Sequence, residues 1–195
     1  MTKEIKFAHI KITDANYFEL GIGKRVLKKQ VYKVQSGIPI YSANVRVIFG
    51  YANKSNMSEF DAPYVLWGID SYFEFNIMSK GVKFATTDHC GYIRIKNENI
   101  LPEYVTYQLN RIKAEHSFDR SWRPSLTNMK KVSIKIPIMP TNHTIKTCES
   151  YQFNLEEQER ITKKFKLVQK VKTKLQLLEE EIQQLESIAD TVILD

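Results

Sequence analysis

Two short segments of the sequence combine residue types that are capable of chemistry. Asp88-His89-Cys90 places an imidazole beside a thiol, which is a reactive pairing when the two side chains meet. Adjacent residues on a strand point to opposite faces, so His89 and Cys90 are not expected to pair. Gly21-Ile22-Gly23-Lys24-Arg25 has the wrong spacing for a phosphate-binding loop and lacks the Ser or Thr that follows the lysine there. We interpret it as a tight turn that presents two cations.

Neither a metal site nor a cofactor site is predicted. The cysteines, Cys90 and Cys148, and the four histidines are scattered without the spacing of metal ligands. We expect both cysteines to be buried apolar side chains in a reducing compartment. The sequence contains no glycine-rich dinucleotide fingerprint and no Asn-Pro-Pro-aromatic methyltransferase motif. These features predict a chain without catalytic activity, metal or cofactor.

Positive charge is concentrated in the first four fifths of the chain. The net charge is +7, and residues 1–154 carry 22 Lys and Arg against 13 Asp and Glu, whereas residues 155–195 carry 7 against 9. No acidic residue lies between Glu19 and Glu59, and a second acid-free basic stretch follows Asp119. Basic stretches can simply keep a surface soluble. Two of them in one domain favour a polyanion, with the phosphate backbone supplying most of the affinity.

The first 153 residues predict an α+β domain that is rich in short strands. One helix is expected to begin at Pro102, with apolar residues at helical spacing as far as Ile112, and a helical turn is expected after Ser125. Residues 139–153 are expected to be a linker. The expected strands are β-branched or aromatic and include a hairpin through residues 68–71 and a pair formed by the fourth and fifth segments: Val45–Tyr51, Tyr64–Gly68, Tyr72–Met78, Gly81–Thr86, Gly91–Ile95 and Val132–Ile138.

Residues 154–195 predict one long helix with a coiled-coil seam. Asn154 is a suitable N-cap, and Glu157 stands three residues later, as in a capping box. About 40 residues make a rod of roughly 60 Å, which is longer than the preceding domain is wide. Packing on its own domain alone is the alternative to a partner helix. Nine of ten a and d positions are apolar, Lys164 being the exception: Ile161, Val168, Val171, Leu175, Leu178, Ile182, Leu185, Ala189 and Val192.

Charge along this helix predicts how it pairs. Residues 160–174 hold seven bases and no acid, and residues 179–195 hold six acids and no base. A parallel pair of identical helices would place like charges together, whereas an antiparallel pair centred near Leu177 places basic halves against acidic halves. Each exposed pair contributes a fraction of a kcal/mol, but the sum selects a direction. We expect an antiparallel coiled coil.

Six segments together resemble the specificity (S) subunit of Type I restriction–modification enzymes, as one target-recognition domain followed by one conserved helical region. The chain departs from the typical subunit, which has two such units, and its link before the helix is longer. The segments are GIPIYSANV (37–45), WGID (67–70), FATTDHCGYIRI (84–95), LPEYVTYQLN (101–110), RPSLTNMKKVSIKIPIMP (123–140) and LEEQERI (155–161).

This resemblance implies a non-catalytic subunit that recognises double-stranded DNA. In the family each domain recognises one half of a bipartite target. The antiparallel helices set the spacer and dock modification subunits, which methylate adenine from S-adenosylmethionine, and restriction subunits join through these. The resemblance therefore implies a target-recognition domain at 1–153 and a dimerisation and spacer helix at 154–195. A single unit would pair with its own copy or with a second S unit.

The residues expected to contact DNA fall into three groups. Cations for phosphates are Lys24, Arg25, Lys28, Lys29, Lys130 and Lys131. Candidates for base edges are Ser42, Asn44, Arg46, Thr87, His89, Arg120 and Arg123, since Arg suits guanine and Asn suits adenine in the major groove. Tyr72 and Trp122 are candidate wedges or stacking platforms, with a core position as the alternative.

Two other functions fit part of the same pattern. One is a detached DNA-recognition subunit of another methyltransferase–nuclease system, and the other is a coiled-coil adaptor that binds nucleic acid such as RNA. No apolar run approaches the roughly 20 residues that span a bilayer, and the charged N-terminus lacks the apolar stretch of a signal peptide. A cytoplasmic protein without a membrane partner is expected.

Overall fold

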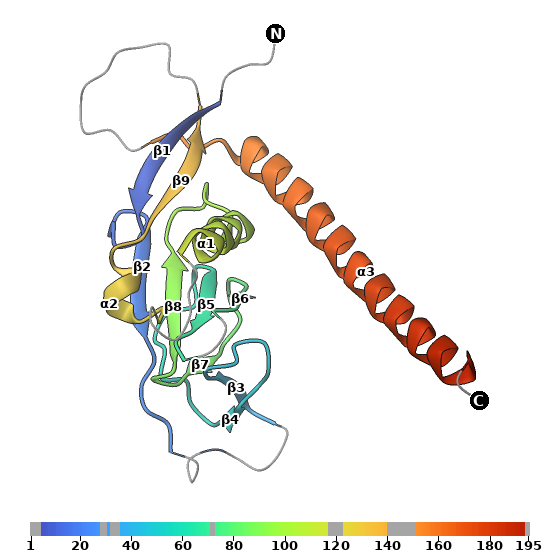
Figure 1. The fold of residues 1–195 in the computed structure, drawn as a ribbon. Coiled ribbons are helices and arrows are strands. Elements are labelled where there is room, and N and C mark those ends of the chain that lie inside the picture. The colour runs from blue at the N-terminus through green and yellow to red at the C-terminus, as the bar shows by residue number, and fades with distance from the viewer. Residues whose placement is uncertain are drawn as a thin grey trace.

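The structure is a computed structural model and describes residues 5–27, 31, 36–70, 73–116, 123–139 and 151–193. It has an α+β domain followed by one long helix, as predicted (Figure 1). The main sheet has four antiparallel strands in the order β2 (Phe18–Ile22), β8 (Cys90–Ile95), β5 (Tyr64–Gly68) and β6 (Phe75–Met78). Every residue of β5 is buried, because this strand lies inside the sheet with packed layers on both faces.

The larger core lies on one face of this sheet. Helix α1 (Pro102–His116) covers that face with Tyr104, Val105 and Leu109, all of which are fully buried. A two-stranded antiparallel ribbon of β1 (Lys6–Lys11) and β9 (Ser133–Ile138) closes the core with alternating buried side chains, as expected for half-buried strands. The predicted helical turn is α2 (Leu126–Met129), where the Ser125 side chain accepts a hydrogen bond from the Asn128 amide.

A smaller three-stranded sheet lies at the end of the domain remote from the start of the long helix (Figure 1). It has the order β4 (Gly50–Ala52), β3 (Ile38–Tyr41) and β7 (Ala85–Thr86), with β3 and β7 parallel. The predicted pairing of Gly81–Thr86 with Gly91–Ile95 is therefore wrong. The first segment contributes only β7, and β7 pairs with β3 because residues 87–89 turn the chain before β8 begins.

The predicted strand Val45–Tyr51 is also wrong over most of its length. Val45 is fully buried in the second core cluster, and the Asn44 side chain accepts a hydrogen bond from the Arg46 amide at 3.0 Å. This Asx-type turn replaces strand pairing, and a strand resumes only at Gly50. Val47, Ile48 and Phe49 are consequently exposed, although their residue types favour a strand.

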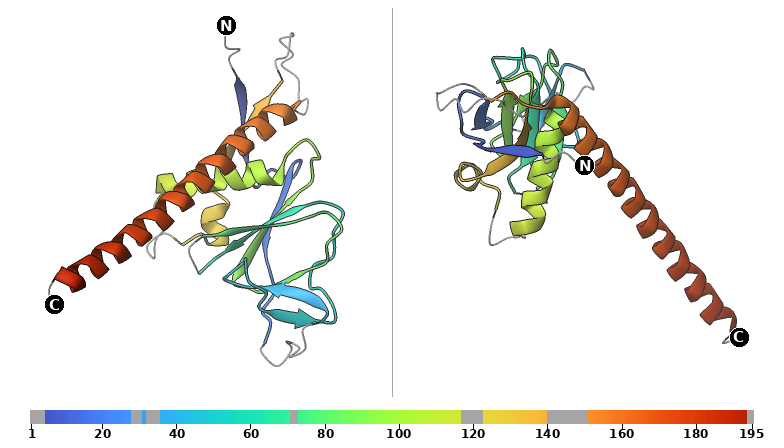
Figure 2. Two further views of the ribbon diagram at one scale, coloured as in Figure 1. Left: turned by 90° about the vertical axis from the view of Figure 1, so that its right-hand side faces the viewer. Right: turned by 90° about the horizontal axis from the view of Figure 1, so that it is seen from above.

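Helix α3 (Leu155–Ile193) begins where its cap predicts, because the Asn154 side chain accepts the Glu157 amide at 3.0 Å. Phe153 is buried beside Tyr17 and pairs with Ile138, so the end of the predicted linker belongs to the core. Figure 2 shows that only the first turns of α3 lie against the domain and that the rest projects away from it. Among the described residues, no helix is long and apolar enough to cross a membrane.

Candidate nucleic-acid interface

The ends of β3 and β7 bring several predicted contact residues together around Thr87. The Ser42 and Thr87 hydroxyls lie 2.9 Å apart, and the Thr87 hydroxyl oxygen accepts the His89 amide at 3.2 Å. The Thr87 amide donates to the Tyr41 carbonyl at 2.9 Å. At 3% exposure Thr87 lies too deep to contact a base edge, so that prediction is corrected: Thr87 holds Ser42 and His89 in place.

Asp70 links two of the predicted base-contacting residues. One carboxylate oxygen pairs with His89 Nδ1, and the other lies 3.4 Å from Arg123 Nη1. The side chains of His89 and Arg123 are 56% and 65% exposed, so both are available to a ligand. Sequence reasoning placed Asp70 in a hairpin connection and missed this role. The available signal was an acid in WGID, one of the segments that carry the family resemblance.

Arg46 forms the centre of a second polar group on the same part of the domain. Its Nε lies 3.2 Å from a carboxylate oxygen of Glu74, the residue just before β6. Partial burial lowers the pKa of Lys113 on α1, and the charges of Glu74 and Arg46 also affect this pKa, Glu74 by raising it and Arg46 by lowering it. Neither Glu74 nor Lys113 was predicted, because their segments are distant in sequence. The Asn44 side chain is exposed, but its oxygen caps the Arg46 amide.

Lys24 and Arg25 are exposed where the chain leaves β2. The predicted tight turn is wrong, since Gly21 and Ile22 belong to the strand. The glycines allow close packing instead. A Cβ on Gly21 would lie 2.5 Å from the Tyr92 ring, and one on Gly23 would overlap the Thr86 and Thr87 carbonyl oxygens. This packing brings the two cations beside the segment that carries Thr87.

The other predicted cations and aromatic residues are more scattered. Lys130 and Lys131 are exposed in the turn after α2, and α2 connects to Arg123 through the Asn128 side chain, which donates to the Arg123 carbonyl at 3.0 Å. No contact described for these lysines joins them to the Ser42–His89 region. Five predicted contact residues lie outside the described residues: Lys28, Lys29, Tyr72, Arg120 and Trp122.

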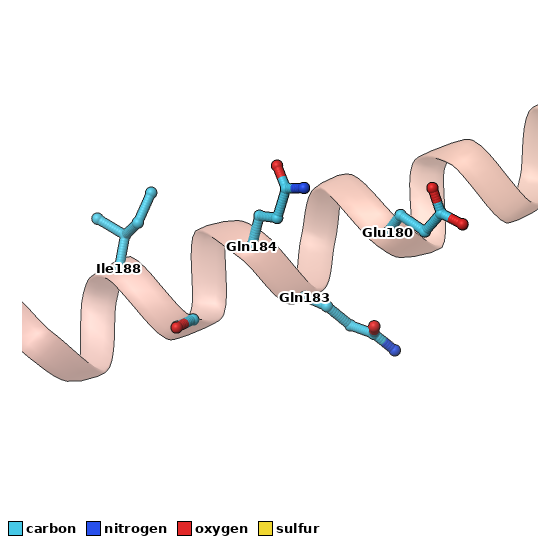
Figure 3. A pocket seen from close by; sticks show the side chains of 5 residues that line it. Glu180, Gln183, Gln184 and Ile188 are labelled. Atoms are coloured by element: carbon cyan, nitrogen blue, oxygen red, sulfur yellow. The ribbon is translucent and has the colours of Figure 1, made fainter.

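The described residues form neither a thiol–imidazole pair at Cys90 nor a cluster of metal ligands. Burial raises the pKa of the Cys90 thiol to about 12, and the exposed His89 side chain pairs with Asp70 instead. No cluster of His, Cys, Asp or Glu among residues 5–27, 31, 36–70, 73–116, 123–139 and 151–193 could hold a metal ion. A shallow hollow is lined by residues of α3 alone, the polar Glu180, Gln183, Gln184 and Ser187 and the apolar Ile188, so it is exposed helix surface and not a cleft between elements (Figure 3).

The predicted dimer seam is an exposed apolar stripe on α3. Ile161 is half-buried against the domain core, whereas the stripe beyond it is at least half exposed. The side chains of Ala189 and Val192 lie outside what the structure describes. The exposed fractions are Val168 50%, Val171 50%, Leu175 53%, Leu178 53%, Ile182 54% and Leu185 66%.

Comparison with known families decides what kind of chain carries these two surfaces. The family model described as Type I restriction modification DNA specificity domain matches residues 11–187, which is most of the chain. The chain belongs to this family. Two curated relatives are putative type I specificity subunits of Mycoplasma pneumoniae. One is 28% identical over 82 residues, covering 42% of this chain and 24% of the relative, and another is 22% identical over 122 residues, covering 63% and 48%.

Solved structures of type I S subunits share the fold. The S subunit from M. genitalium superposes over 95% of this chain and 44% of its own, with a TM-score of 0.53 and 18% identity. The HsdS subunit from Thermoanaerobacter tengcongensis superposes over 84% of this chain and 37% of its own, with a TM-score of 0.59 and 12% identity. This specificity-family chain therefore spans less than half the length of the relatives that it matches.

Proposed function

We propose that this chain recognises a short double-stranded DNA sequence as the non-catalytic specificity component of a Type I restriction–modification system. The observation that carries the proposal is the gathering of exposed and half-buried cationic and polar side chains from distant segments at one end of the domain. Lys24 and Arg25 leave β2 there, and Ser42, His89 and Arg123 come from three other loops. Membership in the family of DNA specificity domains indicates that this ligand is DNA.

The exposed side chains divide by chemistry into positioning and specifying groups. Lys24 and Arg25 are exposed, and no ion pair among the described residues holds them, which suits phosphate contacts. His89 and Arg123 are instead held in fixed places by Asp70, and Arg46 is held by Glu74. Fixed donors and acceptors suit base edges, since discrimination between bases depends on defined geometry.

The apolar stripe of α3 supports pairing with a second helix of the same kind, from another copy or from a second S unit. One antiparallel register matches both apolar and charged positions. It places Lys174 opposite Glu181 and Lys172 opposite Glu179, and it brings together Leu167 and Ile188, which are 63% and 60% exposed outside the seam. Its five layers are Ile161–Val192, Lys164–Ala189, Val168–Leu185, Val171–Ile182 and Leu175–Leu178.

This register has a polar layer that distinguishes it from its neighbours. Lys164 meets the small residue Ala189, which leaves room for its aliphatic stem to reach past the seam into solvent. A shift by one heptad would place Lys164 against Ile182 and would also bring equal charges closer together. A single charged seam position often sets register at some expense of stability, so the antiparallel centre between Gln176 and Leu177 follows from sequence.

Such a pair would hold two domains at the opposite ends of one rod. We propose that each domain contacts one half of a bipartite target and that the paired helices set the spacer. The polar outer face around Glu180, Gln183 and Gln184 stays free for modification subunits, and restriction subunits would assemble through these (Figure 3). The partner subunits then carry out catalysis, and this chain contributes only recognition of the DNA sequence.

Selection from a random-sequence DNA duplex library tests the proposed function. The full chain should enrich one short motif with defined bases, and the same chain should show no comparable enrichment from a random duplex RNA library. Duplex DNA is expected because base edges are accessible in its major groove, whereas the RNA major groove is too deep and narrow. Equal enrichment from RNA, or no motif from DNA, would contradict the proposal.

A further inference from the structure

Asp70 is an acidic side chain in the middle of the basic candidate interface. Its carboxylate is one-third exposed, so it is not sequestered from a ligand that approaches His89 and Arg123. A carboxylate at this place repels phosphate and lowers non-specific affinity for DNA. An acid that opposes binding in general needs another role, and its two partners indicate which role that is.

The position of Asp70 relative to His89 is fixed by the backbone as well as by the side chains. The Ile69 amide donates to the His89 carbonyl at 3.1 Å, and Gly68 pairs with Cys90 at the ends of β5 and β8. The His89 amide donates to the buried Thr87 hydroxyl at 3.2 Å. Asp70 and His89 therefore lie just beyond paired strand ends, and hydrogen bonds of the neighbouring backbone hold the two residues close together.

The second partner, Arg123, is held with comparable definition. Its carbonyl accepts the Ser125 amide at 2.8 Å and the Asn128 side chain at 3.0 Å. The next residue, Pro124, accepts the indole N–H of the fully buried Trp67 at 2.8 Å, which anchors this segment to β5. The carboxylate of Asp70 then draws the exposed guanidinium towards His89.

The contact through Nδ1 determines what the other side of the imidazole offers. In the neutral ring one nitrogen carries the proton and the other accepts hydrogen bonds. Because a carboxylate only accepts, His89 Nδ1 must be the donor in this pair, and in the neutral ring Nε2 is left as an acceptor. Asp88 Oδ1 lies 3.9 Å from Nε2, too far for a hydrogen bond, so Nε2 remains able to accept one from a ligand.

We propose that Asp70 is a specificity-determining positioning residue that fixes the tautomer of His89, so that Nε2 accepts a hydrogen bond from an exocyclic amino group of adenine or cytosine. Arg123, held by the same carboxylate, donates to the neighbouring base pair, with guanine as the best acceptor. The inference rests on the proposed DNA recognition and deepens it, because it assigns one base position to one tautomer.

The substitution Asp70→Asn tests this assignment directly. Arg123 can only donate, so the remaining carbonyl oxygen of the new side chain stays on Arg123 and its NH2 group faces Nδ1. Donation from this NH2 to Nδ1 moves the ring proton to Nε2, which changes from an acceptor into a donor. Selection from the random duplex library should then show one changed position, from adenine or cytosine in the wild type to guanine or thymine in the variant. The preference for the original base should fall by about tenfold. The preference at the neighbouring position should keep guanine but weaken, because Arg123 exchanges an ion pair for a neutral hydrogen bond, and the remaining positions should keep theirs.

Two further variants separate positioning from charge and from direct contact. Asp88→Asn removes the same charge beside the same imidazole but leaves the Asp70 contact, so it should keep the wild-type motif. His89→Ala should lose the preference at that position, and adding Asp70→Asn to it should change nothing more there. Circular dichroism and thermal melting of each variant establish that the domain is folded.

Each remaining outcome decides against a defined statement. An identical motif for wild type and Asp70→Asn overturns the inference and leaves the proposed function intact. The same change in Asp88→Asn shows that charge alone is responsible, and a further change in the His89→Ala background shows that Asp70 contacts the base itself. Both results overturn positioning. Absence of any motif for the wild type overturns the proposed function together with the inference.

Discussion

The domain and the long helix of this chain carry equally regular apolar patterns but treat them differently. In the domain, Trp67, Ile93 and Tyr104 are fully buried. On α3 beyond Phe165, the seam residues from Val168 to Leu185 are at least half exposed. The domain buries its apolar side chains within one chain, whereas the helix can bury its stripe only against another molecule or another unit. A regular apolar pattern therefore predicts that the side chains are buried, but it does not predict whether the same chain or another molecule packs against them.

The transition from side chains buried in the domain to side chains exposed on the helix takes place within the first three turns of α3. Gln158 is fully buried, and its side chain accepts the Leu101 amide and donates to the Asn99 carbonyl, both at 2.9 Å. Phe165 still contacts Tyr107, with ring centroids 5.1 Å apart. A domain boundary at residue 153 or 154 thus marks the start of the helix, while packing on the domain continues for about ten residues more. The angle at which α3 projects is set by these contacts.

The largest expected effect comes from placing charge in the exposed stripe. Val171→Asp with Leu178→Asp should convert a dimer into monomers, because the pair would lose four apolar side chains worth about 1.5–3 kcal/mol each when buried. Light scattering at tens of micromolar measures the mass. Gln169→Asp with Gln176→Asp adds the same charge on the outer face and should remain dimeric.

A wild-type chain that is monomeric at that concentration would contradict self-pairing. The stripe would then require a different S unit. The folding of the domain should be unchanged whether or not the chain forms a dimer, since the core of the domain does not include Val171 or Leu178.

Truncating a core side chain of the domain should lower the free energy of unfolding of the single chain. This loss should be smaller than the free energy lost when the helix pair separates. Trp67→Ala is expected to lower the free energy of unfolding by about 3–5 kcal/mol, because it leaves a cavity above Gly91 and an unpaired Pro124 carbonyl. Leu185→Ala, made in the monomeric Val171→Asp, Leu178→Asp background, should change it by less than about 0.5 kcal/mol. Urea denaturation followed by tryptophan fluorescence or circular dichroism compares them, and equal losses would contradict the distinction between the two regions.

How far sequence predicts this fold depends on how local the determining contacts are. Tyr64–Gly68 is found as a strand with the predicted bounds, and the caps at Ser125 and Asn154 start their helices as expected, because composition and capping act within a few residues. The partner of β7 could not be deduced, since β3 lies some 45 residues earlier in the chain. The exposed segment 46–49 misled the prediction because its residue types favour strands.

The candidate interface shows the same limit. Charge distribution indicated Lys24 and Arg25 as candidates, and the motif segments indicated Ser42, His89 and Arg123, which stay predictions as DNA contacts. The acids that hold some of these residues, Asp70 and Glu74, were not found. Asp70 is 53 residues from Arg123, and no spacing rule connects them. Their role depends on which strand ends the fold places together.

An intermediate effect is expected at Arg94, the ionic counterpart of the apolar core. Its guanidinium, only 10% exposed, pairs with Glu59, with Glu19 at 3.1 Å and with Asp61 at 2.6 Å, linking β2, β8 and the loop before β5. Arg94→Met should lower the free energy of unfolding by about 2 kcal/mol, since three carboxylates would lose their common partner. On α3 the exposed pair Lys163–Glu159 should contribute almost nothing, so Lys163→Met serves as the control.

Acid should reveal the same difference. The hydrogen bond to Arg94 holds the pKa of the Asp61 carboxyl below its usual range. A carboxyl with a lowered folded-state pKa stabilises the protein above the unfolded pKa of about 4 and loses that contribution as pH falls below it. Wild type should therefore lose more stability than Arg94→Met between pH 5 and pH 3. An equal loss of stability in both proteins would show that Arg94 is not responsible for the sensitivity to acid.

The smallest effect concerns the cations. Lys24→Ala with Arg25→Ala should weaken binding of any duplex and reduce the slope of log affinity against log salt by up to about 1.8, at 0.9 for each lost phosphate contact. Lys166→Ala with Lys170→Ala removes the same charge from the outer face of α3 and should leave the slope nearly unchanged. Filter binding across a salt series measures both, and equal slopes for the two variants would remove Lys24 and Arg25 from the interface.

The form of the recognised sequence tests the domain and the helix at once. An antiparallel dimer with a two-fold axis presents two identical domains, so the motif selected by this chain alone should be an interrupted palindrome with a fixed spacer. Deleting one heptad, residues 175–181, should keep both half-sites and shorten the spacer by about three base pairs, because seven residues rise about 10.5 Å along the helix. An asymmetric motif, or a spacer that is unchanged by the deletion, would contradict the account.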